Sequence, residues 1–144
     1  MAAQRSDARE AAVEGLPLVL VVEDDYLAAS FIEEALRDGG YQCAIVASGE
    51  EAITLFEGGS EGYLALATDI NLHGEMDGWE VAQRVRQISP EFPVVYMTGA
   101  AADEWPSKGV PKSILLSKPF APAQLVGAVS QLLNAGSPPA FQNE

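Results

Sequence analysis

The sequence has little cysteine, few basic side chains and no long apolar run. Cys43 is the only cysteine among 144 residues, so the chain cannot form an intramolecular disulfide. The longest apolar stretch, 16–22, is much shorter than the roughly 20 residues that a membrane-spanning helix needs. The sequence therefore predicts neither a disulfide-stabilised secreted protein nor a membrane protein, and we expect the chain in the cytoplasm.

The shortage of basic residues makes the chain strongly acidic. Eight Lys and Arg stand against 21 Asp and Glu, which gives a net charge of −13. Such a charge repels the phosphates of nucleic acids and anionic membranes, so neither is expected as a direct partner. A basic protein surface or a cation suits it better. With 48% hydrophobic residues the chain can form one globular core, which excludes a disordered or fibrous protein.

Short apolar runs alternate with helical patterns along most of the chain. The run at 18–22 is continuous and β-branched, which is typical of a strand covered on both faces. Leu27, Phe31 and Leu36 then recur at helical spacing behind Asp25, a residue suited to capping a helix start. The same alternation predicts further strands at 42–47, 64–68, 93–97 and 113–116, with a second helix capped by Ser48 and Glu51, a third around Val81 and Val85, and a last one from about Pro122.

One segment departs from this alternation. Between the fourth and fifth strands, Trp105-Pro106, Gly109 and Pro111 leave room only for a short or irregular fourth helix. Five strand-helix units still predict an α/β, doubly wound parallel sheet with helices on both faces. We assign this domain to 16–134, and we expect flexible tails at 1–15 and 135–144.

Polar side chains follow the predicted strands where each strand ends, which is where ligands bind in such sheets. Acidic residues clustered there would repel one another without a cation, and carboxylate oxygens are the ligands that Mg²⁺ prefers. A carboxylate at a strand tip can also act as a nucleophile and form an aspartyl phosphate. A lysine and a hydroxyl nearby can bind phosphoryl oxygens, although each alone also fits an ordinary surface position. The residues concerned are Glu23, Asp24, Asp25, Asp69, Asn71, Thr98 and Lys118.

Five motifs together resemble the receiver domain of bacterial two-component response regulators. The resemblance covers about 16–134 and implies a flavodoxin-like (βα)5 sheet with strand order 2-1-3-4-5. The motifs are Val-Val-Glu-Asp-Asp at 21–25, Asp-Ile-Asn-Leu at 69–72, Met-Asp-Gly at 76–78, Thr-Gly at 98–99 and Lys-Pro-Phe at 118–120.

The resemblance also implies a role for each strand-end residue. Asp69 corresponds to the phosphoacceptor, and the donor would be a phosphohistidine of a sensor histidine kinase or a phosphotransfer protein. A cis Lys118-Pro119 bond is expected as well. Of the remaining residues, Asp24 would hold Mg²⁺ directly and Glu23 through water, Asn71 would offer its backbone carbonyl, Thr98 would turn its hydroxyl to the phosphoryl group, and Lys118 would pair with that group.

Some positions differ from the family's usual pattern. Leu115 stands where an aromatic switch residue is common, and Tyr96 is a candidate to take its part. His73 stands where proline is common, and Glu75 looks like an inserted residue. We interpret His73 as a loop side chain, because the chain has no second histidine to complete a transition-metal site.

The leading hypothesis is a stand-alone phosphorylatable switch, because the receiver takes up nearly the whole chain. It would be no enzyme beyond assisting its own phosphorylation and dephosphorylation, and would signal to an unknown downstream protein as a monomer or weak dimer, or serve as a phosphate sink. A Mg²⁺-dependent phosphohydrolase is the second hypothesis, but Asn71 occupies the place of its acid/base aspartate and cannot shuttle protons. A phosphorylation-independent binding module is the third, motivated by Leu115 and the irregular fourth helix.

Overall fold

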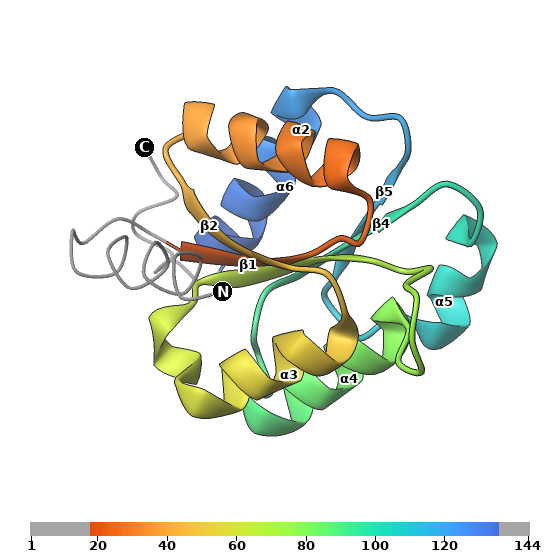
Figure 1. The fold of residues 1–144 in the computed structure, drawn as a ribbon. Coiled ribbons are helices and arrows are strands. Elements are labelled where there is room, and N and C mark those ends of the chain that lie inside the picture. Colours follow the sequence, from red (N-terminus) through yellow and green to blue (C-terminus); the bar gives the residue numbers. More distant parts are fainter. Residues whose placement is uncertain (1–17, 136–144) are drawn as a thin grey trace.

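The computed structural model describes residues 18–135. Five strands in this range form a parallel sheet in the order β2-β1-β3-β4-β5. Figure 1 shows helices on both faces of this sheet, as the sequence predicts. The strands are β1 (Leu18–Val22), β2 (Gln42–Val46), β3 (Ala65–Asp69), β4 (Val94–Thr98) and β5 (Ile114–Ser117). The helices are α2 (Tyr26–Asp38), α3 (Gly49–Gly58), α4 (Gly78–Ile88), α5 (Trp105–Lys108) and α6 (Pro122–Ala135), with 3-10 turns η1 (Ser60–Gly62) and η2 (Ala102–Glu104).

The predicted strands are confirmed to within one residue at each end. The tails expected at 1–15 and 135–144 lie outside the described residues, apart from Ala135, which ends α6. None of the helices in the described part of the chain is long and apolar enough to cross a bilayer.

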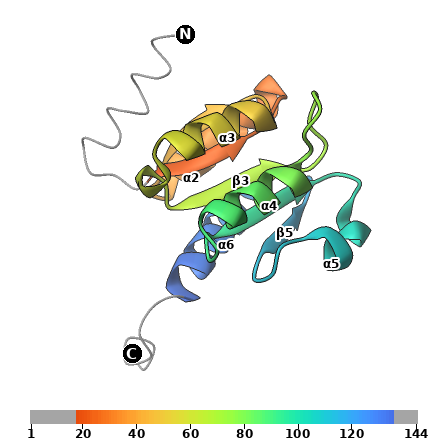
Figure 2. The ribbon, with the colours of Figure 1, turned by 90° about the horizontal axis from the view of Figure 1, so that it is seen from below.

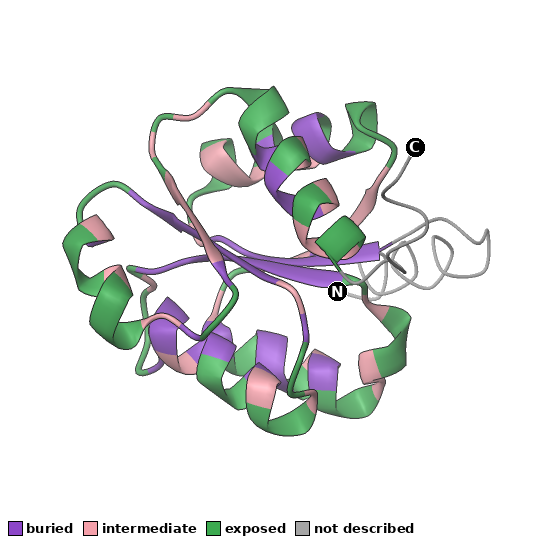
Figure 3. Cartoon of the chain, turned by 180° about the vertical axis from the view of Figure 1, so that it is seen from behind, coloured by how far each residue is buried: buried purple, intermediate pink, exposed green. Residues whose placement is uncertain are grey.

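Two apolar layers hold the helices to the sheet. Side chains alternate along β1, so that Val19 and Val21 face α2 and α6, whereas Leu20 and Val22 face α3 and α4. Every residue of β1, β3 and β4 is buried, which agrees with the mostly apolar sequences of these strands (Figure 3). These three central, parallel strands end at Val22, Asp69 and Thr98, at the carboxyl edge of the sheet.

Capping side chains begin the helices soon after the strand ends. Asp25 accepts a hydrogen bond from the Ala28 amide (2.8 Å), and Ser48 accepts one from the Glu51 amide (3.2 Å), as the sequence predicts. Asp77, whose capping role the sequence analysis missed, accepts a hydrogen bond from the Glu80 amide (3.0 Å) at the start of α4. The loops from β1 to α2 and from β2 to α3 are therefore short, whereas the loop from β3 to α4 spans residues 70–77.

The fourth helix is short, which confirms the sequence prediction. Figure 2 shows α5 beside the β5 edge of the sheet. With only four residues, α5 covers less of the sheet than a longer helix would. Two hydrogen bonds connect the segment around α5 to its surroundings. The Trp105 indole donates to the Ser113 hydroxyl (3.0 Å), and the Val110 amide donates to the Tyr96 hydroxyl (3.0 Å). Leu115 on β5 consequently stays only half-buried.

Candidate functional site

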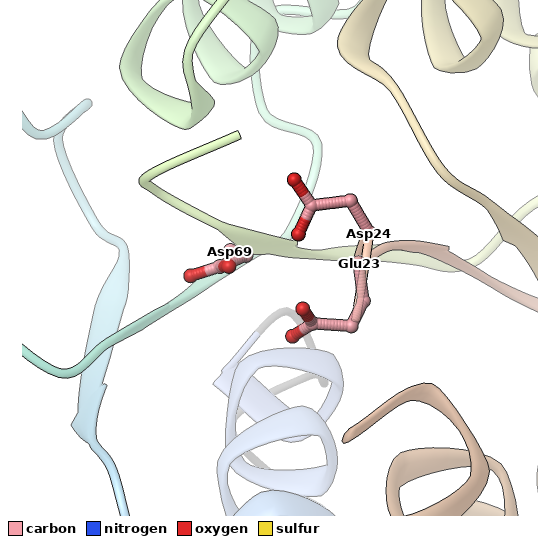
Figure 4. A group of neighbouring side chains, drawn as sticks. All are labelled: Glu23, Asp24 and Asp69. Atoms are coloured by element: carbon pink, nitrogen blue, oxygen red, sulfur yellow. The ribbon is translucent and has the colours of Figure 1, made fainter. Parts of the chain in front are cut away.

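Three carboxylates meet at the carboxyl edge of the sheet. Glu23 and Asp24 follow β1 directly, and Asp69 ends the neighbouring strand β3. One oxygen from each lies within 4.8 Å of the others. Figure 4 shows the carboxylates of Glu23 and Asp24 leaving the end of β1 on opposite sides and turning toward the side where Asp69 lies. The cluster that the sequence predicts is therefore present.

Burial makes this cluster electrostatically unusual. Asp69 is 7% exposed and Glu23 only 3%. Burial raises the pKa of the Asp69 carboxyl from 3.8 to about 6, the Glu23 carboxylate adds to the rise, and the Lys118 ammonium opposes it. The negative charges are thus held together at a cost in free energy, which a cation bound between them would relieve.

Lys118 provides part of that compensation. Its Nζ lies 3.0 Å from Glu23 Oε1 and 3.5 Å from Asp69 Oδ1. Burial opposes the charge of Lys118, but its hydrogen bond to Glu23 and the charges of Asp69 and Glu23 outweigh burial and raise the pKa of Lys118. One ammonium against three carboxylates leaves the site negative. Hard oxygen donors with excess negative charge fit Mg²⁺.

Thr98 lies beside this cluster at the end of β4. It is buried, and β4 pairs with β3 so that Asp69 and Met97 are register partners. The Thr98 hydroxyl oxygen accepts hydrogen bonds from the amides of Ala100 (3.1 Å) and Ala101 (2.8 Å). In this structure Thr98 therefore fixes the turn that leads into η2, and its own proton is left to donate.

The other predicted site residues have less defined surroundings. Asn71 is exposed, two residues beyond Asp69, and its backbone carbonyl as a metal ligand stays a prediction. The peptide bond between Lys118 and Pro119 is cis, as expected. Asp25 caps α2 instead of joining the acidic cluster.

The structure adds one residue that the sequence analysis set aside. The His73 side chain is 94% exposed, as expected of a loop residue, yet its Nδ1 lies 2.6 Å from Asp24 Oδ2. The His73 amide donates to the same oxygen (2.8 Å). The two residues are 49 positions apart, so no local sequence pattern indicates the contact.

Tyr96 is fixed in the core below Thr98. It is fully buried, its ring lies 4.8 Å from that of Trp79, and Leu115 is its register partner on β5. Its hydroxyl accepts a hydrogen bond from the Val110 amide, so this hydrogen bond links Tyr96 to the segment that follows α5. Whether it takes part in switching stays a prediction.

Comparisons with known proteins place these features in one family. The response regulator receiver domain matches residues 19–130. The chain is 34% identical over 119 residues to the response regulator receiver protein CpdR of Brucella abortus, covering 81% of this chain and 97% of CpdR. It is 35% identical over 117 residues to the transcriptional regulatory protein TctD of Salmonella typhimurium, covering 80% of this chain but 51% of TctD.

A solved structure agrees with these relatives. The response regulator receiver protein from Sinorhizobium medicae WSM419 is 43% identical, with a TM-score of 0.80, covering 83% of this chain and 96% of that one. Receiver domains are in general phosphoacceptor switches rather than classical enzymes, and histidine kinases or phosphotransfer proteins phosphorylate them. By sequence and by fold, the chain belongs to the response regulator receiver domain family.

Proposed function

We propose that Asp69 accepts a phosphoryl group from the phosphohistidine of a sensor kinase or phosphotransfer protein, in a reaction that depends on Mg²⁺. A carboxylate oxygen of Asp69 forms the new O–P bond while the N–P bond to the donor imidazole breaks. The observation that carries this proposal is the buried Asp69 at the tip of β3, within reach of two further carboxylates and a lysine.

Each neighbouring residue has a part in that transfer. Glu23, Asp24 and Asp69 would hold Mg²⁺ together with the backbone carbonyl of Asn71, and the bound ion would neutralise charge between carboxylate and phosphoryl oxygens. Lys118 is within 3.5 Å of Asp69, so its ammonium can pair with a phosphoryl oxygen there. The Thr98 hydroxyl, at the end of the adjacent strand, can donate to another.

The surface beside the site supports a protein as the donor. Tyr26 and Leu27, which open α2 just after Asp24, are 81% and 75% exposed. Phe31 on the same helix is 41% exposed and its ring lies 5.9 Å from that of Phe120, which closely follows Lys118 in the chain. Large exposed apolar side chains that cluster mark contact sites for proteins. With a net charge of −13, neither nucleic acid nor an anionic membrane is proposed as a partner.

The response is proposed to pass from Thr98 to the α5 segment. If the Thr98 hydroxyl turns toward a phosphoryl group, the amides of Ala100 and Ala101 lose their acceptor. The start of η2 would then rearrange, changing the surface offered to a downstream protein. The match over 97% of the receiver protein CpdR supports output through contacts of the receiver itself. Its state as a monomer or weak dimer is a further part of the proposal. Leu115 and the short α5 favour one alternative, a binding module that does not respond to phosphorylation.

Intact mass separates these two functions. Wild-type protein treated with acetyl phosphate and Mg²⁺ is expected to gain about 80 Da, the mass of one phosphoryl group on a carboxylate. Excess EDTA should abolish the gain, because the carboxylate cluster then lacks its counter-charge. If neither acetyl phosphate nor a panel of histidine kinases adds mass, the binding module becomes the better hypothesis.

Lys118→Ala is expected to keep phosphorylation but weaken the response, because Asp69 remains as nucleophile while the phosphoryl group loses its ammonium partner. NMR can follow the amides of Ala100 and Ala101, which donate hydrogen bonds to the Thr98 hydroxyl in the unmodified protein. Their chemical shifts should change clearly on phosphorylation of the wild type and less in the variant. Equal changes in both proteins at equal phosphate incorporation would remove Lys118 from the switch.

A further inference from the structure

His73, a loop residue, makes two polar contacts with Asp24, one of the proposed metal ligands. Asp24 Oδ2 accepts a hydrogen bond from the backbone amide of His73 (2.8 Å), and the imidazole Nδ1 of His73 lies 2.6 Å from the same oxygen, within ion-pair distance. Both contacts reach the same oxygen, so together they hold Oδ2 in place and restrict the rotation of the carboxylate. Figure 4 shows one oxygen of the Asp24 carboxylate turned toward Glu23 and Asp69 and the other turned away.

The loop that carries His73 is itself held in place. Two residues further on, the amide of Glu75 donates a hydrogen bond to Glu50 Oε2 (3.2 Å) at the start of α3. Between them Gly74 adopts a φ of 99°, a left-handed conformation that glycine takes without strain. The loop is thus bonded on one side to the end of β1 and on the other to α3, so His73 keeps its place although its side chain faces solvent.

We propose that His73 is a positioning residue for the metal site, which orients the Asp24 carboxylate before Mg²⁺ binds. This inference rests on the magnesium site of the proposed function. Groups that hydrogen-bond a ligating carboxylate fix its geometry, so less orientational freedom is lost when the ion binds. Proline, common at this position in the family, has neither an amide hydrogen nor an imidazole and could make neither bond. The loop of this chain therefore supplies a contact that its usual sequence does not.

Isothermal titration of Mg²⁺ into unphosphorylated protein tests the inference without any activity measurement. His73→Ala keeps the amide hydrogen bond but loses the imidazole. We expect its Mg²⁺ affinity to fall about 3- to 10-fold, less than the roughly 10- to 100-fold typical of such partners, because the contact is exposed. His73→Asn is the matched control. Its amide nitrogen branches from Cγ as Nδ1 does, so it should restore affinity to within about twofold of wild type.

Thermal unfolding in EDTA should be the same for all three proteins, since a solvent-exposed loop side chain contributes little to stability. Unchanged Mg²⁺ affinity in His73→Ala, or tighter binding, overturns the positioning role while leaving the magnesium site standing. Equal losses in His73→Ala and His73→Asn overturn it too. Failure of the wild type to bind Mg²⁺ overturns the magnesium part of the proposed function, and this inference with it.

Discussion

Asp69→Asn is expected to take up no phosphoryl group from acetyl phosphate or from any kinase that modifies the wild type. The amide keeps the shape of the side chain but is not a nucleophile, so no aspartyl phosphate can form. Intact mass should show the gain of about 80 Da in the wild type and none in the variant. Asp38→Asn, the same change at an exposed position that ends α2, is the matched control and should gain mass normally.

Stability distinguishes this loss from misfolding. The folded protein holds the Asp69 proton more tightly than the unfolded chain, because the pKa of the carboxyl is about 6 rather than 3.8. The metal-free wild type should therefore lose free energy of unfolding through this group as pH rises from about 4 to 6. Asp69→Asn lacks that loss and should be more stable than the wild type at pH 8 in EDTA, by at most about 3 kcal/mol.

Thermal or urea unfolding at pH 4 and pH 8 checks the sign of this effect. The advantage of Asp69→Asn over the wild type should grow between the two pH values. A variant less stable than the wild type at pH 8 would mean that Asp69 supports the fold, and the missing phosphorylation could then no longer be attributed to chemistry alone.

The sequence predicts the sheet and the acidic cluster well because both depend on short patterns. Buried strands such as Leu18–Val22 must be apolar on both faces, and each is followed directly by its polar side chains. The carboxyl ends of parallel strands lie at one edge, so Glu23, Asp24 and Asp69 had to be neighbours once the strands were placed. Capping residues such as Asp25 and Ser48 act within three residues and are equally visible.

Contacts between segments far apart in the chain could not be predicted from the sequence. The bond from His73 to Asp24 and that from Val110 to Tyr96 join segments whose approach depends on loop conformation, not on periodicity. The sequence marks Tyr96 as a candidate switch residue, but nothing in its neighbours reveals that its hydroxyl accepts a hydrogen bond from Val110, in the segment after α5. Such contacts leave no local pattern in the sequence, so only the structure reveals them.

The close approach of α4 to the end of β3 gives the largest expected effect on stability. Gly78 opens α4, and its amide donates to the Ile70 carbonyl (2.8 Å). A Cβ at this position would lie 2.2 Å from the Asp69 carbonyl oxygen and 2.7 Å from Ile70 Cα. Both are backbone atoms, which cannot turn aside as a side chain can. Gly78→Ala should therefore lower the free energy of unfolding by about 3 kcal/mol or more.

The same substitution on α6 provides the control. Gly127 has no atom within 4 Å of where its Cβ would stand, so Gly127→Ala should stabilise the protein by about 0.5–1 kcal/mol through the better helix propensity of alanine. Urea unfolding of the two variants should thus give shifts of opposite sign.

Gly78→Ala should also displace Asp69, since relief of the clash must move either α4 or the end of β3. A shift of about 1 Å at a reacting group can slow a reaction roughly a hundredfold, so phosphate uptake by the folded fraction of Gly78→Ala should fall by at least about tenfold. If stability drops but uptake by the folded protein stays normal, α4 has moved and β3 has not. Asp69 would then be held by its strand alone, and the glycine would serve helix packing rather than the phosphoacceptor.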